Sequence, residues 1–158
     1  MLSKFQIIHD KNTETSDPKS QLKLGKFLIN SSDDRDRWVE SIGLQHITES
    51  ANSGNSSAQN YLGEFYYDGE RIEKDLKNAF MWYTLAANQG NIAAKYSQGW
   101  CYYMGEGVEK NLKKAYENFN WGSEKEDSVC QNMMGIFYKE GIHVQINKNK
   151  AIKYFILS

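Results

Sequence analysis

The sequence predicts an all-α fold, a solenoid of tandem helix-turn-helix repeats with a 36-residue period. First, a glycine recurs at this step, at Gly63, Gly99 and Gly135. Second, further columns keep the same step, namely Tyr66, Tyr102 and Tyr138; Gly69, Gly105 and Gly141; Asp75, Asn111 and Asn147; Ala79, Ala115 and Ala151; and Tyr83, Phe119 and Phe155. Third, the 158 residues include a single proline, which favours helices ended by glycine. A fixed period of this length is typical of units that bury their apolar faces by stacking on one another.

Two helices are predicted in each unit, most clearly in residues 55–90. The first helix spans Ala58–Tyr67, where apolar and small residues follow helical spacing, and Gly69 supplies the left-handed residue that ends it. Asp75 then caps the second helix, because its carboxylate can accept hydrogen bonds from the first-turn amide groups. Apolar residues at i, i+4 and i+7 form one face of this second helix, which Gly90 ends.

The repeated glycine lies in the middle of the first helix, where glycine costs roughly 0.5–1 kcal/mol relative to alanine. Its recurrence therefore predicts a tight helix crossing in each unit. Upstream, Leu24-Gly25 matches Leu62-Gly63 and marks a degenerate first unit, with residues 30–37 as its lengthened charged loop. The predicted organisation is a flexible lead at residues 1–17 and four units, 18–54, 55–90, 91–126 and 127–158.

The second unit carries a specific motif. Residues 58–69 read AQNYLGEFYYDG, and residues 75–90 read DLKNAFMWYTLAANQG. These strings resemble the Sel-one-like repeat (SLR) family, a branch of the tetratricopeptide-like helical solenoids, whose pattern is A-x-x-x-L-G-x-x-Y-x-x-G followed by D-x-x-K-A-x-x-W-Y-x-x-A-A-x-x-G. The chain departs from this pattern at Asn78, Gln98, Asn118, Phe119, Cys130 and Met134. The resemblance implies a right-handed α/α solenoid that holds protein partners and has no catalytic residues of its own.

The resemblance also implies where a partner binds, because the first helices of such repeats line the concave face. The positions not used for packing are Asn60, Glu64, Tyr67 and Asp68 in the second unit, Tyr96, Trp100, Tyr103 and Met104 in the third, and Asn132, Ile136 and Lys139 in the fourth. Tyr96, Trp100 and Tyr103 share one helical face and have the composition of a binding hot spot. We therefore expect partner binding to centre on these three aromatic side chains.

A purely structural interpretation competes with this one. Aromatic residues at helical spacing are usually core, and solenoid packing uses many tyrosines and tryptophans. Trp82 and Tyr83 match the Trp-Tyr pair of the family and are predicted to pack within the second helix. The acidic run from Glu64 to Asp75 is interleaved with basic residues, which favours a solvated face over an acidic strip for a basic partner.

The sequence offers no constellation for catalysis, cofactor or metal binding. The histidines, His9, His46 and His143, fall at unrelated repeat positions, and no histidine lies at helical spacing beside Cys101. Cys101 and Cys130 stand 29 positions apart with no Cys-x-x-Cys pair, so zinc-site spacings are missing and free thiols are expected. No glycine-rich phosphate loop is present.

Charge and hydropathy bound the partners and the location. The formal net charge of −1 lacks the basic excess that nucleic-acid binding needs. No apolar stretch approaches the ~18 residues of a membrane span, and the first ten residues lack the apolar core of a signal peptide. We expect no nucleic acid and no membrane as partner, and a cytoplasmic protein.

The final helix, with Ile152, Phe155, Ile156 and Leu157, carries apolar side chains without an obvious polar cap. The expectation is that it folds back on the preceding helix with partial exposure, in a monomer or a weak dimer through this helix. A covering partner protein is the other alternative.

Two versions of a non-catalytic protein-binding function follow. One is an immunity protein that inhibits a bacterial toxin by occupying its surface, and the other is a cytosolic adaptor for a signalling, secretion or host-directed complex. An enzyme or ligand sensor is the alternative from another class, and a segment of a longer array is a further one.

Overall fold

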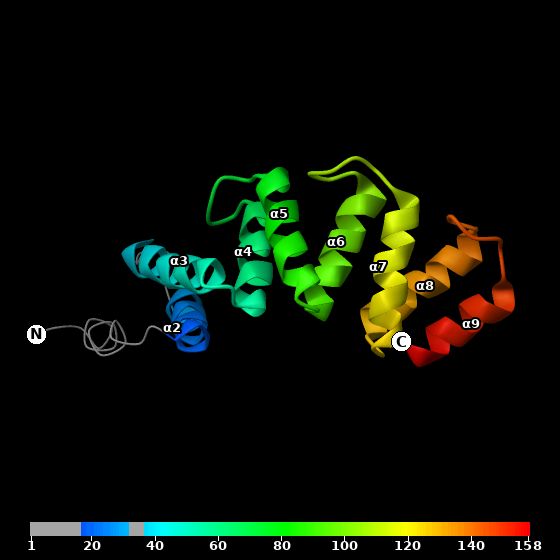
Figure 1. The fold of residues 1–158 in the computed structure, drawn as a ribbon, viewed down its shortest axis with the longest axis horizontal. Helices are drawn as coiled ribbons and strands as arrows, with labels where there is room; N and C mark the ends of the chain where they lie inside the picture. Colours follow the sequence, from blue (N-terminus) through cyan, green and yellow to red (C-terminus); the bar gives the residue numbers. More distant parts are fainter. Residues whose placement is uncertain (1–16, 32–36) are drawn as a thin grey trace, which may run out of the picture. The chain divides into compact units, whose positions relative to one another are not determined.

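The computed structural model describes residues 17–31 and 37–158. Within these ranges it contains helices and no strands (Figure 1), which confirms the all-α class. The helices are α2 (Pro18–Ser31), α3 (Arg37–Asn52), α4 (Ser56–Asp68), α5 (Leu76–Asn88), α6 (Ile92–Met104), α7 (Leu112–Glu124), α8 (Ser128–Glu140) and α9 (Lys148–Leu157). The lead predicted at residues 1–17 lies outside the described residues except for Asp17, and the handedness of the solenoid stays a prediction.

The chain divides into two compact units, Met1–Leu62 and Gly63–Ser158, with the boundary inside α4. In the first unit α2 packs on α3, and Leu24, Leu28 and Val39 form the core of the pair. The loop expected at residues 30–37 is shorter than predicted, because α2 continues to Ser31 and α3 begins at Arg37. Residues 32–36 of that loop lie outside the described residues.

The crossing of α2 and α3 depends on two glycines. A Cβ atom added at Gly25 would lie 2.7 Å from the carbonyl oxygen of Gly43, and one added at Gly43 would lie 2.9 Å from the carbonyl oxygen of Gly25. The Gly25 position also faces Ile47, whose Cγ1 would be 2.6 Å away. The two backbones therefore approach each other directly, as the glycine of this degenerate unit predicted.

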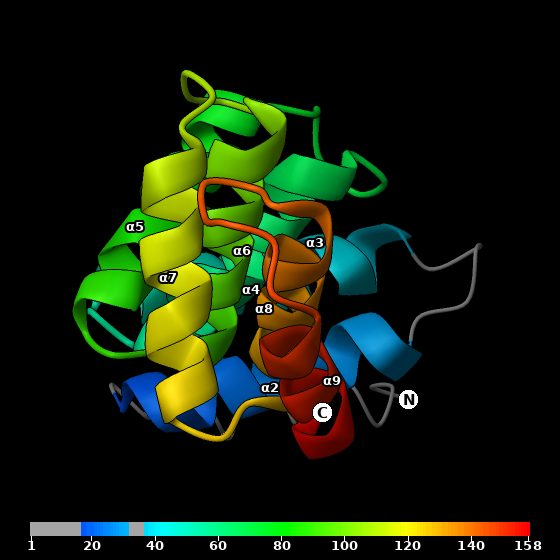
Figure 2. The same cartoon turned by 90° about the vertical axis from the view of Figure 1, so that its right-hand side faces the viewer.

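In the compact unit Gly63–Ser158, each helix from α5 to α9 packs on the next one along the chain. Figures 1 and 2 show α6 to α9 as neighbouring rods joined by short loops. A core cluster of α7 and α8 is formed by Ala115, Phe119, Cys130, Met133, Met134 and Phe137. This cluster is the floor on which the aromatic residues of α6 pack.

The repeated polar residues cap the second helices as predicted. The side chains of Asp75, Asn111 and Asn147 each accept a hydrogen bond from a first-turn amide of α5, α7 and α9. The backbone N–H of the same three residues donates to the carbonyl oxygens of Tyr66, Tyr102 and Tyr138, respectively. In each repeat the last residue of the loop is therefore bonded both to the helix before it and to the helix after it.

The mid-helix glycines make the predicted tight crossings. A Cβ atom at Gly63 would lie 2.6 Å from the ring of Tyr83, one at Gly99 would lie 2.9 Å from the ring of Phe119, and one at Gly135 would lie 2.5 Å from the ring of Phe155. Each glycine column therefore faces the aromatic column of the following helix. Tyr83 is 3% exposed, which confirms its predicted packing role.

Candidate functional site

Four aromatic side chains from α4 and α6 form one connected group, named here the aromatic face: Tyr67, Tyr96, Trp100 and Tyr103. The rings of Tyr96 and Trp100 are stacked, with centroids 6.3 Å apart and planes at 27°. The rings of Trp100 and Tyr103 are 5.7 Å apart and tilted. The i, i+4, i+7 spacing read from the sequence therefore does place these three α6 side chains on one side of the helix.

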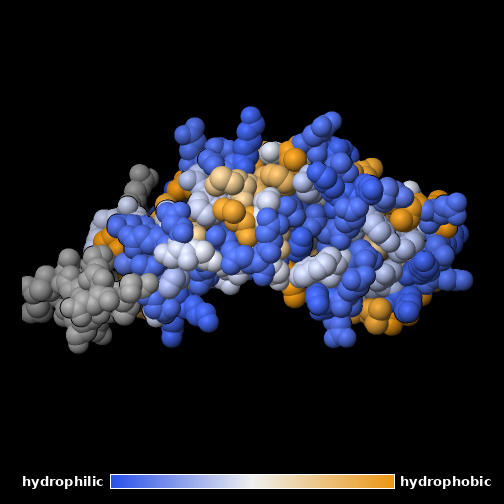
Figure 3. All heavy atoms as spheres, viewed as in Figure 1, coloured by the Kyte–Doolittle hydropathy of each residue, from blue (hydrophilic) through white to orange (hydrophobic). Residues whose placement is uncertain are grey.

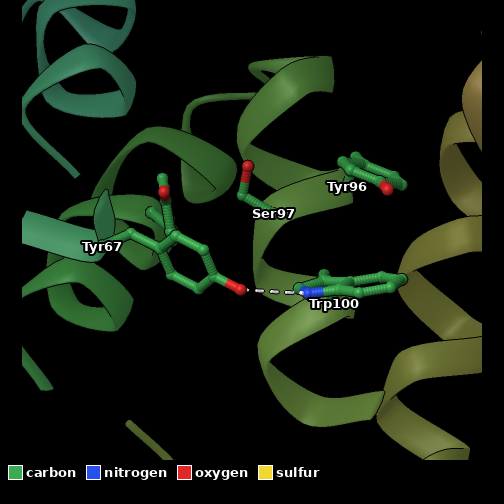
Figure 4. A pocket seen from close by; sticks show the side chains of 5 residues that line it. Tyr67, Tyr96, Ser97 and Trp100 are labelled. Atoms are coloured by element: carbon green, nitrogen blue, oxygen red, sulfur yellow. Dashed lines mark hydrogen bonds between the residues drawn. The ribbon is translucent and has the colours of Figure 1, made fainter. Parts of the chain in front are cut away.

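Hydrogen bonds fix two members of the aromatic face. The Tyr67 hydroxyl donates to Oε2 of Glu106 at 2.6 Å, and its oxygen accepts from the indole Nε1–H of Trp100 at 3.2 Å. Figure 4 shows the Tyr67 hydroxyl directed at the indole nitrogen, with Tyr96 beside the indole on the same helix. A side chain held by such a network needs little further ordering when a partner binds.

The titration of the tyrosines reflects these surroundings. Burial, with the Glu106 carboxylate as hydrogen-bond acceptor, raises the pKa of Tyr67 to about 12. Burial also raises the pKa of Tyr96 above its ordinary value. Both phenols stay neutral at physiological pH, so they offer ring surfaces and hydrogen bonds rather than charge.

The aromatic face is half-buried. Its residues therefore combine the two roles considered from the sequence, core packing and an exposed binding surface. On one side Tyr96 lies 5.7 Å from Phe119, and Tyr103 lies 5.8 Å from Phe137, both ring centroid distances. On the other side the rings keep part of their surface exposed to solvent. These residues complete the core and also present an apolar surface.

A small pocket opens at the edge of this face. Its walls are Tyr67 of α4, Tyr83 of α5, and Tyr96, Ser97 and Trp100 of α6, and its volume is about 190 Å³. Pockets for drug-sized ligands are usually about 300–1,000 Å³. The pocket is therefore of a size to receive a side chain rather than a cofactor.

The other predicted binding residues within residues 63–158 lie near the aromatic face or on α8. Glu64 is half-buried, and Asp68 and Met104 are exposed. On α8, Asn132 is exposed, and Ile136 packs against the core cluster. Lys139 on the same helix is exposed and pairs with Glu140 at 2.9 Å.

Asn60 differs from the expectation. It is only 7% exposed and takes part in interactions inside the protein, so it has little surface for a partner. At the equivalent positions in the later repeats, Tyr96 is half-buried and Asn132 is exposed. The rule that selects the third residue before each glycine therefore fails in the α4 repeat, because burial at this position varies between repeats.

Sequence reasoning missed three contributors: Ser97, Tyr83 and Glu106. Tyr83 was predicted as packing alone, yet part of its ring closes the pocket. Glu106 lies in the loop after α6, 39 residues from its partner Tyr67. The signal for it is the solenoid itself, because this step is close to one repeat and brings each loop beside the preceding first helix.

The chemistry of the described residues is otherwise that of a packed scaffold. Cys101 and Cys130 are free and buried, and burial raises the pKa of the Cys101 thiol to about 12. Such a thiol is protonated and poorly nucleophilic at neutral pH. The described ranges contain no group of three or more histidine, cysteine, aspartate or glutamate side chains arranged to hold a metal ion.

Two further surface features accompany the aromatic face. On the side seen in Figure 3, hydrophobic side chains form small patches separated by hydrophilic ones. On α9, Ile152, Ile156 and Leu157 are exposed, whereas Tyr154 stacks on Tyr138 of α8 with centroids 5.8 Å apart.

In the part of the chain that the structure describes, no helix has the length and apolarity needed to cross a membrane.

Solved structures share this fold. The crystal structure of c5321, a protective antigen present in uropathogenic Escherichia coli strains with an SLR fold, has a TM-score of 0.86 and 25% identity over 99% of this chain. The Sel1 repeat protein from Oxalobacter formigenes has a TM-score of 0.81 and 26% identity over 96%. The chain spans 33% and 61% of these two proteins, respectively.

A third structure, cysteine rich protein B of Helicobacter pylori, has a TM-score of 0.59 and 18% identity. The match covers 81% of this chain and 95% of that protein, and it indicates the fold alone. Comparison with curated proteins gives no match.

The family model described as Sel1 repeat matches residues 56–91, 93–120 and 128–158. The three matches coincide with the helix pairs α4–α5, α6–α7 and α8–α9. Proteins with these repeats generally mediate protein–protein interactions, and their solenoid is typically a non-catalytic scaffold. The chain belongs to the Sel1 repeat family.

Proposed function

We propose that this protein is a non-catalytic binding module whose protein partner docks on the aromatic face. The observation that carries the proposal is the Glu106–Tyr67–Trp100 hydrogen-bond chain, which holds partly exposed rings in fixed positions. Tryptophan and tyrosine dominate binding hot spots, and rings that are already ordered lose little entropy on association. Glu64, Asp68 and Met104 form the polar and apolar rim, and Asn132, Ile136 and Lys139 extend the surface along α8.

The specific version that we propose is an immunity protein that inhibits a bacterial toxin in the cytoplasm. A preorganised aromatic cluster supports it, since neutralising a toxin requires one tight partner. The buried free thiols of Cys101 and Cys130 support a reducing compartment. The alternative within the same class is an adaptor for a signalling, secretion or host-directed complex, which requires several weaker partners.

The test is affinity capture from the native cytosol, followed by titration calorimetry with the purified partner. The variants are Trp100→Ala and Tyr96→Ala, and the matched control is Trp121→Ala, which removes a half-buried tryptophan from α7. Circular dichroism checks that all three variants stay folded. We expect one partner at 1:1 stoichiometry, lost by the first two variants and kept by the control.

The identity and number of partners separate the two versions. A single tight partner with nuclease, lipase or other toxin activity, encoded beside this protein, supports the immunity role. Several partners of moderate affinity support the adaptor role. A partner kept by folded Trp100→Ala and Tyr96→Ala alike contradicts docking on the aromatic face.

A further inference from the structure

The pocket beside the aromatic face has walls of ring surface on several sides. Tyr67, Tyr83, Tyr96 and Trp100 contribute rings from three successive helices. The faces of aromatic rings carry negative quadrupole potential and attract cations placed within about 6 Å of the centroid. A pocket with four such rings is therefore suited to a cation that also has an apolar stem.

The polar groups of the pocket are arranged to accept hydrogen bonds. The Ser97 hydroxyl donates its hydrogen to the carbonyl oxygen of Ala93 at 3.1 Å, which leaves the lone pairs of Oγ directed elsewhere. The Tyr67 hydroxyl uses its hydrogen on Glu106. A ligand that brings hydrogen-bond donors fits this arrangement better than one that brings acceptors.

Carboxylates lie near two rings of the pocket wall, those of Tyr67 and Tyr83. Glu106 contacts the Tyr67 hydroxyl directly. Glu64 and Asp68 lie one turn apart on α4 and are close enough to Tyr83 to add to the effect of burial in raising the pKa of its phenol. Among the described residues, the one cation over a ring of the pocket wall is Lys74, with Nζ 5.5 Å from the Tyr67 centroid. The Tyr67 ring thus has an ammonium group over its face and the Glu106 carboxylate at its hydroxyl.

The chain already uses this kind of contact on nearby rings. Besides Lys74, Lys110 places Nζ 5.8 Å from the ring centroid of Tyr103. In the described part of the chain no lysine or arginine covers Tyr96 or Trp100 in the same way. Of the wall rings without such a cation, these two are partly exposed, whereas Tyr83 is almost fully buried.

We propose that the pocket receives an arginine or lysine side chain of the protein partner, with its stem against Tyr96 and Trp100 and its charge toward Glu106. The partner is then basic at the segment that contacts the aromatic face. This inference rests on the proposed function, which it extends by stating the chemistry of the partner. The volume of about 190 Å³ matches one such side chain.

The test is an NMR titration of the ¹⁵N-labelled chain with capped pentapeptides. The probe is Gly-Ser-Arg-Ser-Gly, and the same peptide with citrulline keeps the shape of the side chain and removes its charge. The readout is the indole N–H signal of Trp100, assigned by its loss in Trp100→Phe. We expect saturable shifts with arginine and lysine peptides and roughly tenfold weaker binding of the citrulline peptide.

Two variants test the charge without disturbing the rings. Glu106→Gln retains an amide oxygen that accepts from Tyr67 and removes one negative charge, so binding of the arginine peptide should weaken about threefold. Glu117→Gln, an exposed position on α7, makes the same charge change elsewhere and should have no effect. The indole signal of Trp121, over whose ring Lys95 and Lys125 lie, should stay in place.

Equal binding of the arginine and citrulline peptides, or shifts at Trp121 in place of Trp100, would overturn the inference. A captured partner that depends on Trp100 but tolerates Glu106→Gln, together with no binding of the arginine peptide, overturns the inference and leaves the proposed function standing. Saturable arginine-peptide binding without any protein partner supports the cation pocket and contradicts the proposed function.

Discussion

Two helix crossings in this molecule use the same glycine position in different ways. Where α2 crosses α3, Gly25 faces the backbone of Gly43, with the carbonyl oxygen 2.7 Å from an added Cβ atom. Where α6 crosses α7, Gly99 faces the ring of Phe119 at 2.9 Å. A side chain can turn to make room, and a backbone carbonyl within a helix cannot. The corresponding glycine positions therefore serve two packing arrangements that differ in how large a substitution they tolerate.

The largest effect is expected at the backbone contact. Gly25→Ala should reduce the free energy of unfolding by about 3 kcal/mol, at the upper end of overpacking costs, because both Ile47 and the Gly43 carbonyl obstruct the methyl group. Urea unfolding followed by circular dichroism measures the change. Adding Ile47→Val should recover little, since the carbonyl contact remains. Full recovery in that double variant would mean that the backbones can separate and that the comparison is wrong.

Gly99→Ala is expected to cost less, about 1–2 kcal/mol, because its neighbours are side chains of Phe119 and Asn118. The double variant with Phe119→Leu should be more stable than the sum of the two single effects predicts, by about 1 kcal/mol. The same urea unfolding experiment on the wild type, both single variants and the double variant measures this coupling. Additive effects would show that the ring of Phe119 is not what limits the approach of α6 and α7.

Much of the fold could be predicted because it depends on sequence patterns between residues that are close together in the chain. The capping residues, the left-handed glycines at Gly69, Gly105 and Gly141, and the mid-helix glycines each act within one helix pair. The repeat then extends each assignment along the chain. Even the degenerate first unit follows, since Gly25 faces Ile47 as Gly63 faces Tyr83.

The candidate site could be predicted only in part, because its geometry depends on contacts between repeats. The spacing of Tyr96, Trp100 and Tyr103 sets one shared helical face, but the hydrogen bond from Tyr67 to Glu106 joins residues 39 positions apart. The depth of each position is also set by its neighbours, which explains why Asn60 is buried while Asn132 is exposed. Periodicity gives the direction of a side chain and not the amount of it that is covered.

The repeats within residues 63–158 use the same type of polar capping residue. A substitution at one cap is therefore a milder test of how uniform the repeats are. Asn111→Ala removes the side-chain oxygen that accepts from the Lys114 amide, and it should cost about 1 kcal/mol. Asn111→Asp, the residue type found at Asp75, should retain most of the stability. The melting temperatures of both variants check this. An equal loss in both would show that the amide nitrogen of Asn111, rather than the cap, matters.

The smallest expected effect is on the pH dependence of stability. It comes from Tyr67 in the aromatic face and not from the helix crossings. The pKa of Tyr67 is raised to about 12, so the folded protein holds this proton more tightly than the unfolded chain, whose tyrosines titrate near 10. Its contribution to stability is complete below about pH 10 and is lost as the pH rises from there through 12. Tyr67→Phe removes this term while leaving the ring in place.

The comparison is between wild type and Tyr67→Phe at pH 9 and at pH 11.5, measured as melting temperature. The wild type should lose more stability over this interval than the variant, because Tyr83 and Tyr116 titrate in both proteins and cancel. Gly99→Ala, which acts by steric overlap, should show the wild-type dependence on pH at a lower melting temperature. If Tyr67→Phe instead keeps the full wild-type loss, the pKa of Tyr67 is not raised in the folded protein, and neither burial nor the hydrogen bond to Glu106 holds the phenol proton.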